Sequence, residues 1–275
     1  RNFDFQGISI RHAGGTTDIT VQNSTFTSVN GAAINTGPNV AATTNTHDVD
    51  VLNNTFTNVG IAAELFSSRG GPTTAVVSGN SVTGTHSDAI RLVAFNQAGG
   101  GAAASFTGTV SGNTLSGVAA DNVPSASGGA GIFIAAEDGV DAQVLVENNS
   151  ISGHTAAGGL VAECFRTQNQ RDGVLDVVFR GNSCTDFPTN FFGAVFLGND
   201  FDTSGPFTNT CIDFAATNTY SNTNGLFANT FATDSTGSSI MDLPNGFNAN
   251  LASFPQLDFG NAPTAGACSI APLSP

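Results

Sequence analysis

The chain has 275 residues, of which only 10% are charged, and its formal net charge is −14 because 21 acidic side chains outnumber seven arginines, with no lysine. A surface of this charge should repel nucleic acid and anionic lipid, which both require clustered positive charge. No apolar run approaches the roughly 20 residues that span a bilayer, so we expect neither a nucleic-acid partner nor membrane insertion.

A short motif recurs along the chain, and its clearest copy reads Val-Ser-Gly-Asn-Thr-Leu-Ser-Gly-Val at residues 110–118. The residues that precede the Ser or Thr of successive copies are Ser24, Asn54, Asn80, Asn113, Asn149, Asn182 and Asn218. Their spacings are 30, 26, 33, 36, 33 and 36 residues. A constant motif at variable spacing predicts a single solenoid, whose stacked coils carry loops of different length.

Each copy predicts three short strands. Apolar residues alternate with small polar ones in the motif itself, as in Thr25-Phe26-Thr27, and this period of two indicates a strand with the apolar residue inward. A second strand follows each motif, and a third returns to the next motif. Examples of the second strand are residues 89–93, 131–134, 159–162 and 193–197, and examples of the third are residues 142–146 and 174–179. No window shows the apolar spacing of a helix.

An asparagine occupies the corner between two of these strands in most copies. Asparagine tolerates left-handed backbone, and its amide can bond to the same amide in the next coil. We therefore predict a structural ladder of Asn54, Asn80, Asn113, Asn149, Asn182 and Asn218. Glycine stands before the corner residue in several copies and serves the same bend.

Three strands per coil, with an asparagine corner, resemble the right-handed parallel β-helix of the pectate-lyase-like superfamily. The resemblance covers about residues 5–232 and implies an all-β, single-stranded parallel β-helix of about seven to eight coils. Residues 128–132 and 179–182 are also similar to the repeats of polymorphic outer-membrane proteins and autotransporter passengers. The superfamily includes polysaccharide lyases, hydrolases, tailspikes and adhesins, so the resemblance specifies a fold and leaves the activity open.

The composition changes at about residue 233, where prolines become frequent. We predict a β-helix over residues 1–232 and a C-terminal cap over residues 233–275 that covers the open end of the solenoid. A disulfide between Cys211 and Cys268 would fasten this cap, with a stabilisation of roughly 3–5 kcal/mol. Cys164 and Cys184 fall on inward positions of adjacent coils and form either a second disulfide or two buried thiols.

Stacking places alternate residues of the second strand in columns. If Ile90, Ile132, Leu160 and Val195 point inward, one outward row contains Glu64, Arg91, Phe133, Glu163 and Phe196. Carboxylates, a guanidinium and phenyl rings in one row suggest a groove that binds sugar or docks a protein. The alternative is a salt-bridged face beneath long loops, with the phenylalanines covered.

Glycoside hydrolysis requires two carboxyl groups. The candidate pairs are Glu163 with Asp172 or Asp176, Glu137 with Asp138 and Asp141, and Asp200 with Asp202. The aspartate motifs of polygalacturonases and the lysine of pectate-lyase-like sites are absent, so we assign no catalytic residue and lean against an enzyme. Asp48 with Asp50, and Asp200 with Asp202, are the only hint of calcium; no cofactor and no metal ligand are assigned.

The outward Ser and Thr of the motif predict a flat hydroxyl face, similar to the threonine ladders of ice-binding β-helices. The alternative is that these residues are simply soluble strand formers. Small uncharged residues in place of lysine and glutamate suggest export, and a chain that begins inside repeat-like sequence suggests a processed piece. We therefore favour an acidic, extracellular structural or adhesive β-helix that contacts itself, a cell-surface protein or a glycan. A polysaccharide lyase or hydrolase is the main alternative, and an ice-binding protein is a further one.

Overall fold

The computed structural model describes residues 6–12, 15–38, 46–67, 71–95, 104–120, 129–153, 155–156, 163–170, 173–185, 195–199, 210–214, 217–220, 226–230, 240–243, 248–250 and 257–259. Within these ranges the chain forms strands and turns, and none of it is helical. The described residues accordingly contain no helix that could cross a membrane.

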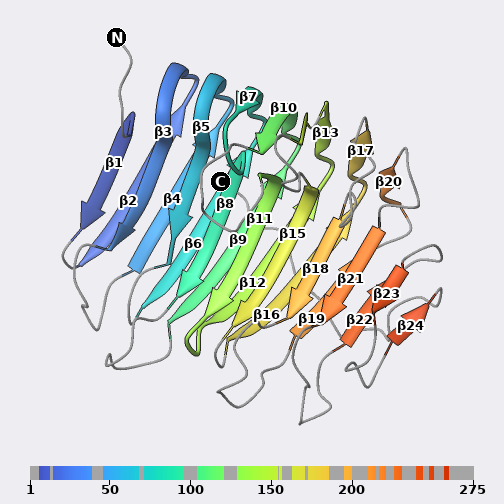
Figure 1. The fold of residues 1–275 in the computed structure, drawn as a ribbon. Coiled ribbons are helices and arrows are strands. Elements are labelled where there is room, and N and C mark those ends of the chain that lie inside the picture. Colours follow the sequence, from blue (N-terminus) through green and yellow to red (C-terminus); the bar gives the residue numbers. More distant parts are fainter. Residues whose placement is uncertain are drawn as a thin grey trace.

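One wall of the structure is a nine-stranded sheet whose neighbouring strands are all parallel. Figure 1 shows these strands stacked in chain order. They are β2 (Thr16–Gln22), β4 (Thr46–Leu52), β6 (Pro72–Ser78), β9 (Ser105–Ser111), β12 (Asp141–Glu147), β16 (Val174–Arg180), β19 (Thr210–Phe214), β22 (Ile240–Leu243) and β24 (Leu257–Phe259).

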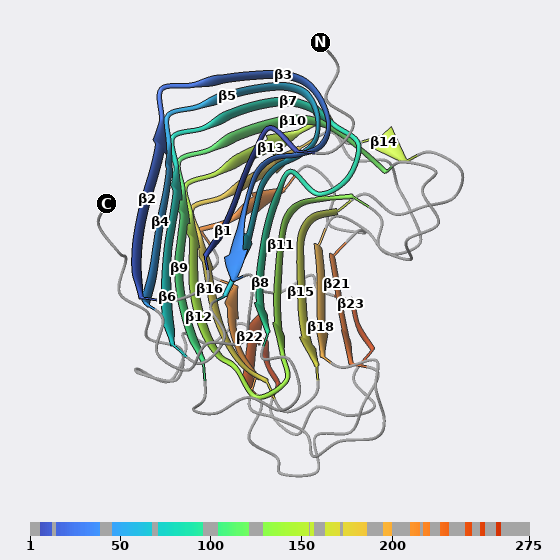
Figure 2. The same cartoon turned by 90° about the vertical axis from the view of Figure 1, so that its left-hand side faces the viewer.

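A 15-stranded sheet supplies the other two walls, which Figure 2 shows nearly end-on. The corner strands, the first five of which are labelled in the upper part of Figure 2, are β3 (Thr25–Pro38), β5 (Thr55–Phe66), β7 (Ser81–Thr85), β10 (Thr114–Ala120), β13 (Ser150–Ser152), β17 (Ser183–Thr185) and β20 (Thr219–Tyr220). The loop-side strands are β1 (Ile8–His12), β8 (Ile90–Phe95), β11 (Ala130–Glu137), β15 (Glu163–Gln170), β18 (Val195–Asn199), β21 (Leu226–Thr230) and β23 (Asn248–Asn250). The long strands β3 and β5 run through both walls, and β14 (Thr155–Ala156) pairs with β10.

This arrangement is a parallel β-solenoid, so the predicted fold class is confirmed. The number of coils differs from the predicted seven to eight, since one wall alone contains nine strands. Parallel pairing also continues past the predicted boundary at residue 232, because β22 and β24 extend the nine-stranded sheet and β23 pairs with β21. The change in composition at residue 233 therefore does not coincide with the end of the stacked strands.

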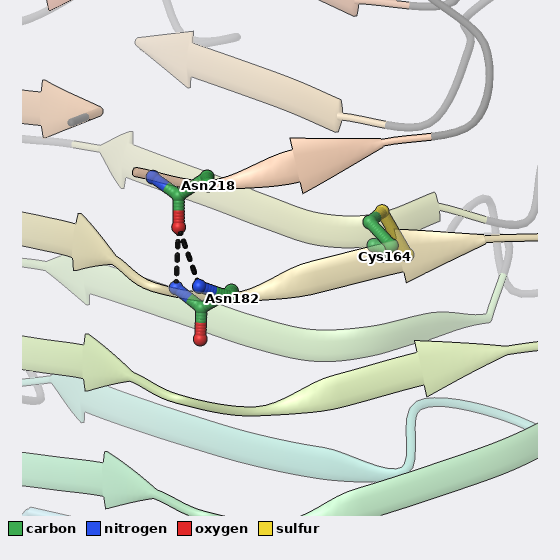
Figure 3. Close-up of a disulfide and its surroundings, with 4 residues drawn as sticks. Cys164, Asn182 and Asn218 are labelled. Atoms are coloured by element: carbon green, nitrogen blue, oxygen red, sulfur yellow. Dashed lines mark hydrogen bonds between the residues drawn. A yellow bond between two sulfur atoms is a disulfide. The ribbon is translucent and has the colours of Figure 1, made fainter. Parts of the chain in front are cut away.

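The core lies between the walls and is made of the inward residues of the strands whose side chains the structure describes. Val144, Val146 and Ile134 are at most 1% exposed and represent the branched side chains that fill most coils. Further along, Phe165, Phe179 and Phe214 pack with ring centroids 5.1–6.1 Å apart. Cys164 and Cys184 are joined in a disulfide, so the structure links two adjacent coils covalently (Figure 3). Cys268, the predicted partner of Cys211, lies outside the described residues.

An asparagine ladder runs along the corner between the nine-stranded sheet and the corner strands. Each Oδ1 accepts hydrogen bonds from the main-chain N–H and the Nδ2 of the preceding ladder residue, as Asn218 does from Asn182 at 3.0 and 2.8 Å (Figure 3). Each Nδ2 also donates to a carbonyl one coil back, for example from Asn149 to Val110 at 2.9 Å. The six asparagines Asn54, Asn80, Asn113, Asn149, Asn182 and Asn218 continue this pattern without a break.

The left-handed backbone at this corner belongs to the residue before the ladder asparagine, which corrects the expectation from the sequence. The residues before Asn54, Asn80, Asn113, Asn149 and Asn182 have φ between 54° and 66° and are Asn53, Gly79, Gly112, Asn148 and Gly181, and Asn23 before Ser24 has φ 51°. The physical reason is that the two residues meet different structural requirements. The ladder asparagine must point its amide inward and along the stack, so the turn is made by its exposed neighbour, where glycine and asparagine are tolerated.

Candidate functional site

Three of the five residues predicted for the outward row lie side by side on the loop-side wall. In the strand register, Glu64 of β5 stands next to Arg91 of β8, and Arg91 stands next to Phe133 of β11. All three are partly or largely covered, with Phe133 only 9% exposed. The stacking of the coils therefore brings together residues that are 27 and 42 positions apart in the sequence.

The fourth predicted member of the row is wrong. Phe133 pairs with Arg166, whereas Glu163 pairs with Ala130, three positions earlier in each strand. The described part of this loop-side strand runs from Glu163 to Gln170, and the predicted strand at residues 159–162 lies outside the described residues. Phe196 does follow Arg166 in the register, but its side chain lies outside the described residues, as do Leu160 and residue 162.

Arg91 is held by two carboxylates. Its Nη1 lies 3.0 Å from Oε1 of Glu64, and its Nε and Nη2 lie 2.7 and 2.6 Å from Oδ2 of Asp88. The second oxygen of Asp88 accepts a hydrogen bond from the main-chain N–H of Ala130 at 2.8 Å. Glu64 also accepts a hydrogen bond from Asn35. Asp88 is buried, so its charge is stabilised by contacts and not by water.

Arg166 forms a second pair two coils further along. Its Nε and Nη2 lie 2.6 and 3.0 Å from the two oxygens of Glu163, which is a bidentate contact. Asp88 and Glu163 are both neighbours of Ala130 in the same column. The pairs Asp88–Arg91 and Glu163–Arg166 therefore repeat one arrangement, with Phe133 in the row between the two arginines. We call these four charged residues, together with Glu64, the Arg–carboxylate cluster.

Burial makes the carboxyl group of Glu163 a weaker acid than that of an exposed glutamate. The side chain is fully buried, and this loss of solvent raises its pKa to about 7. Arg166 opposes the rise by its charge and its hydrogen bonds, and the negative charge of Asp88 adds to it. The pKa of Glu163 therefore lies well above the usual value of a glutamate carboxyl group.

Aromatic side chains adjoin the cluster on the same outer surface. The guanidinium carbon of Arg91 lies 5.7 Å from the centroid of the Phe133 ring, within cation–π range. Phe133 packs with Val93 and Ala135, and Phe66 and Phe95 border them in an edge-to-face pair at 5.7 Å. This small apolar cluster is separate from the main core, because its side chains point to the outside of the wall.

Within the described residues, the other predicted carboxylates do not belong to the Arg–carboxylate cluster. Asp176 lies on β16 of the nine-stranded sheet, a different wall from the one that carries Glu163. Glu137, Asp138 and Asp141 follow one another at the turn from β11 to β12, where Asp138 has φ 57°. Asp172, Asp200 and Asp202 lie outside the described residues.

The first predicted calcium pair lies on the outer side of the nine-stranded sheet. Asp18 stands next to Asp48 in the register, Thr74 donates a hydrogen bond to Asp48, and partial burial followed by the charges of Asp48 and Asp18 raises the pKa of Asp50. Across the part of the chain that the structure describes, no group of three or more His, Cys, Asp or Glu side chains could hold a metal ion.

The corner strands present two columns of hydroxyl groups. The first column contains Thr25, Thr55, Ser81, Thr114, Ser150, Ser183 and Thr219, and the second contains Thr27, Thr57, Thr83, Ser116, Ser152 and Thr185. All of them are exposed or half-buried. Neighbours repeat at roughly 4.8 Å along each column, and the columns are roughly 7 Å apart.

Two residues of the Arg–carboxylate cluster were not identified from the sequence, namely Asp88 and Arg166. A signal for them does exist, since an acidic residue stands three positions before an arginine at the start of two loop-side strands. Comparison of the chain with protein-family models, with curated proteins and with solved structures finds no match. The function is therefore argued from this geometry.

Proposed function

We propose that the chain is an extracellular structural or adhesive β-solenoid that contacts a protein or a glycan through its loop-side wall. One observation carries this proposal: both arginines of the cluster are engaged by carboxylates, and the inner carboxylates, Asp88 and Glu163, are 1% and 0% exposed. Groups that are buried and paired shape and stiffen a surface, whereas a catalytic carboxyl must reach its substrate.

Two further observations support an extracellular location. The Cys164–Cys184 disulfide is of the kind that persists in oxidising surroundings outside the cell. The surface is poor in charge, with seven basic residues in 275. We also infer, from the asparagine corner and three strands per coil, that the fold is related to the pectate-lyase-like β-helices, a group in which adhesins and enzymes share one architecture.

The test is binding of the full chain to a panel of glycans and extracellular proteins. Glu64→Gln removes one charge from the cluster while keeping a hydrogen-bond acceptor for Asn35, so we expect it to weaken binding several-fold. Glu147→Gln is the matched control, since Glu147 pairs with Arg180 on the nine-stranded sheet. Equal binding by both variants would place the contact on another wall, and no binding by the wild type would refute adhesion.

The alternative function is cleavage of a polysaccharide, and Glu163 is the observation that favours it. A carboxyl group with a pKa of about 7 suits a general acid at neutral pH. Asp88 lies two strands away in the same column, roughly 9–10 Å by strand spacing, near the upper limit of about 9.5 Å for inverting glycosidases. Release of new chain ends from a polysaccharide, abolished by Glu163→Gln, would establish this alternative.

Ice binding is a further candidate, favoured by the hydroxyl columns of the corner strands. No charged side chain belongs to either column, and the columns stay in register from Thr25 to Thr219. A flat periodic array of hydroxyl groups could order water in the same repeat. Thermal hysteresis of the wild type, lost when Thr27 and Thr57 are replaced by bulky charged residues, would show this function.

A further inference from the structure

Three asparagines of the chain stand in the tripeptide Asn-X-Ser or Asn-X-Thr, the acceptor pattern for asparagine-linked glycans in secreted proteins. They are Asn23, Asn53 and Asn148, and the hydroxyl groups of the pattern belong to Thr25, Thr55 and Ser150. All three asparagines are left-handed corner residues, with φ of 51°, 54° and 55°. The fold therefore brings every such tripeptide of the sequence to one corner of the solenoid.

This corner exposes both groups of the acceptor pattern. Asn53 and Asn148 are exposed, and so are Thr55 and Ser150 two positions later. Asn23 and its hydroxyl residue are exposed in the same way. A left-handed residue forms the tip of a turn, and surface turns are where such acceptors occur.

The strand alternation separates the acceptors from the ladder asparagines beside them. Two positions after a corner residue, the chain points outward and carries a hydroxyl group. Two positions after a ladder residue, it points inward and carries an apolar side chain, as Phe56 does after Asn54 and Ile151 does after Asn149. Nδ2 of Asn149 also donates two hydrogen bonds inside the wall. Of two adjacent asparagines, one is therefore fixed in the ladder and the other is open to modification.

Asn148 has more room around it than the other two acceptors. Its neighbours in the corner column, one coil back and one coil on, are Gly112 and Gly181, which have no side chains. A Cβ built at Gly112 meets no atom within 4 Å. Asn23 and Asn53, in contrast, are direct neighbours in the column, roughly 4.8 Å apart. Asn148 is therefore the site at which we expect the fullest occupancy.

We propose that Asn23, Asn53 and Asn148 are acceptors for asparagine-linked glycans. This inference rests on the extracellular location proposed above, because the acceptor pattern is used in secreted proteins. The co-substrate is an oligosaccharide joined through a diphosphate to a lipid. In the transfer, Nδ2 forms a bond to C1 of the first sugar and gives up one proton, while the bond from C1 to the diphosphate oxygen breaks and the lipid diphosphate leaves.

Glycans at this corner would stand away from the loop-side wall. In Figure 2 the chain bends from the nine-stranded sheet into the corner strands at the upper left, whereas β8, β11 and β15 lie to the right. Modification therefore leaves the loop-side wall free for the proposed contact. The acceptors border the first hydroxyl column, since they stand two positions before Thr25, Thr55 and Ser150. A glycan there would obstruct contact of that column with a flat ice surface.

Mass spectrometry of the full chain, secreted by a eukaryotic cell, tests the acceptors. Peptide N-glycosidase in heavy-oxygen water converts each glycosylated asparagine into a labelled aspartate. We expect label at Asn148, and also at Asn23 and Asn53. The adjacent ladder residues Asn54 and Asn149 serve as internal controls and should carry none. A folded, secreted chain without label at Asn148 would overturn the inference.

Substitutions at exposed positions test the pattern without disturbing the core. Ser150→Ala removes the required hydroxyl group and should abolish the label at Asn148, whereas Ser150→Thr should keep it. Ser152→Ala, on the same strand, is the matched control and should leave the label unchanged. Label that persists in Ser150→Ala would contradict the assignment.

A gain of modification is the converse test. Gly112→Asn completes the acceptor pattern with Asn113 and Thr114 at an exposed corner that has space for a side chain. We expect this variant to carry one glycan more than the wild type. A folded, secreted Gly112→Asn chain without the added glycan would show that the corner does not accept sugar.

Failure of this inference and failure of the proposed function give different results. A chain that lacks the label but binds a member of the glycan and protein panel refutes the glycan sites alone. A labelled chain that binds no member of the panel refutes adhesion alone and supports the glycan sites.

Discussion

Oδ1 of Asn149 accepts two hydrogen bonds from Asn113, one from its main-chain N–H at 3.0 Å and one from its Nδ2 at 2.9 Å. The two residues are 36 positions apart in the sequence and adjacent in the stack. One amide therefore satisfies a buried main-chain donor and fixes the register of two coils, and each ladder residue repeats this role for its neighbour.

Removing one member of the ladder should destabilise the whole solenoid. In Asn113→Ala, the buried N–H of Asn80 and the carbonyl of Val77 lose their partners. Buried unpaired groups cost about 1–3 kcal/mol each, so we expect a loss of about 3 kcal/mol in the free energy of unfolding, measured by chemical denaturation. Thr114→Ala, at the exposed neighbour, is the control and should change stability by less than about 0.5 kcal/mol. Equal effects of the two substitutions would refute the role of the ladder.

The left-handed corner residue gives a second prediction at a single position. Gly112 has φ 62°, and a Cβ built there meets no atom within 4 Å, so backbone conformation alone decides the effect of substitution. Gly112→Ala should cost about 1–2 kcal/mol. Gly112→Asn should cost less, because Asn23, Asn53 and Asn148 adopt the same conformation in other coils. Thermal denaturation of both variants measures the difference, and the reverse order of stability would be inconsistent with the structure.

The Cys164–Cys184 disulfide closes a loop with a sequence separation of 20 residues. On the loop-entropy estimate, its removal should lower the free energy of unfolding by about 3 kcal/mol. The double variant Cys164→Ala, Cys184→Ala avoids leaving a buried hydroxyl and should remain folded with a lower denaturation midpoint. An unchanged midpoint under non-reducing conditions would show that the crosslink adds nothing to stability.

Stability should fall as the pH rises from about 5 to 8, and Glu163 should account for part of this slope. Its pKa is raised from 4.5 to about 7 on folding, so between these values the folded chain binds more protons than the unfolded chain. Stability therefore decreases with pH over that interval, by up to about 3 kcal/mol from this group. Glu163→Gln should flatten the pH dependence, and Glu147→Gln on the nine-stranded sheet should not. A wild-type slope in Glu163→Gln would contradict the raised pKa.

The sequence predicts the ladder and the strand pattern because both depend on local rules. An asparagine before Ser-Val-Thr or Thr-Leu-Ser is recognisable in one coil, and stacking then follows from repetition. The register of the fourth loop-side strand was mispredicted for a physical reason. Residues 159–162 match the apolar pattern as well as Cys164-Phe165-Arg166-Thr167 does, and the sequence alone does not show that the latter segment pairs with β11.

Part of the candidate site was predictable because its residues also follow the local strand pattern. Glu64, Arg91 and Phe133 each follow the period of two within their strands, so their common row was predictable once the coils were aligned. The contacts of Asp88 and Glu163 occur at strand starts, where no alternation indicates which way a side chain points. Burial of Leu145 and Val178 on the outer side of the sheet was also unpredictable, because apolar residues on both faces of a strand are equally typical of a fully buried strand.

The most direct test of the central claim is a turnover assay with the intact protein on a panel of neutral and acidic polysaccharides. The assay records new reducing ends and unsaturated products for the wild type and for Glu163→Gln. If the Arg–carboxylate cluster shapes a contact surface, neither protein should release products, while the wild type binds at least one member of the glycan or protein panel. Product release by the wild type that Glu163→Gln abolishes would contradict the account and establish Glu163 as a catalytic residue.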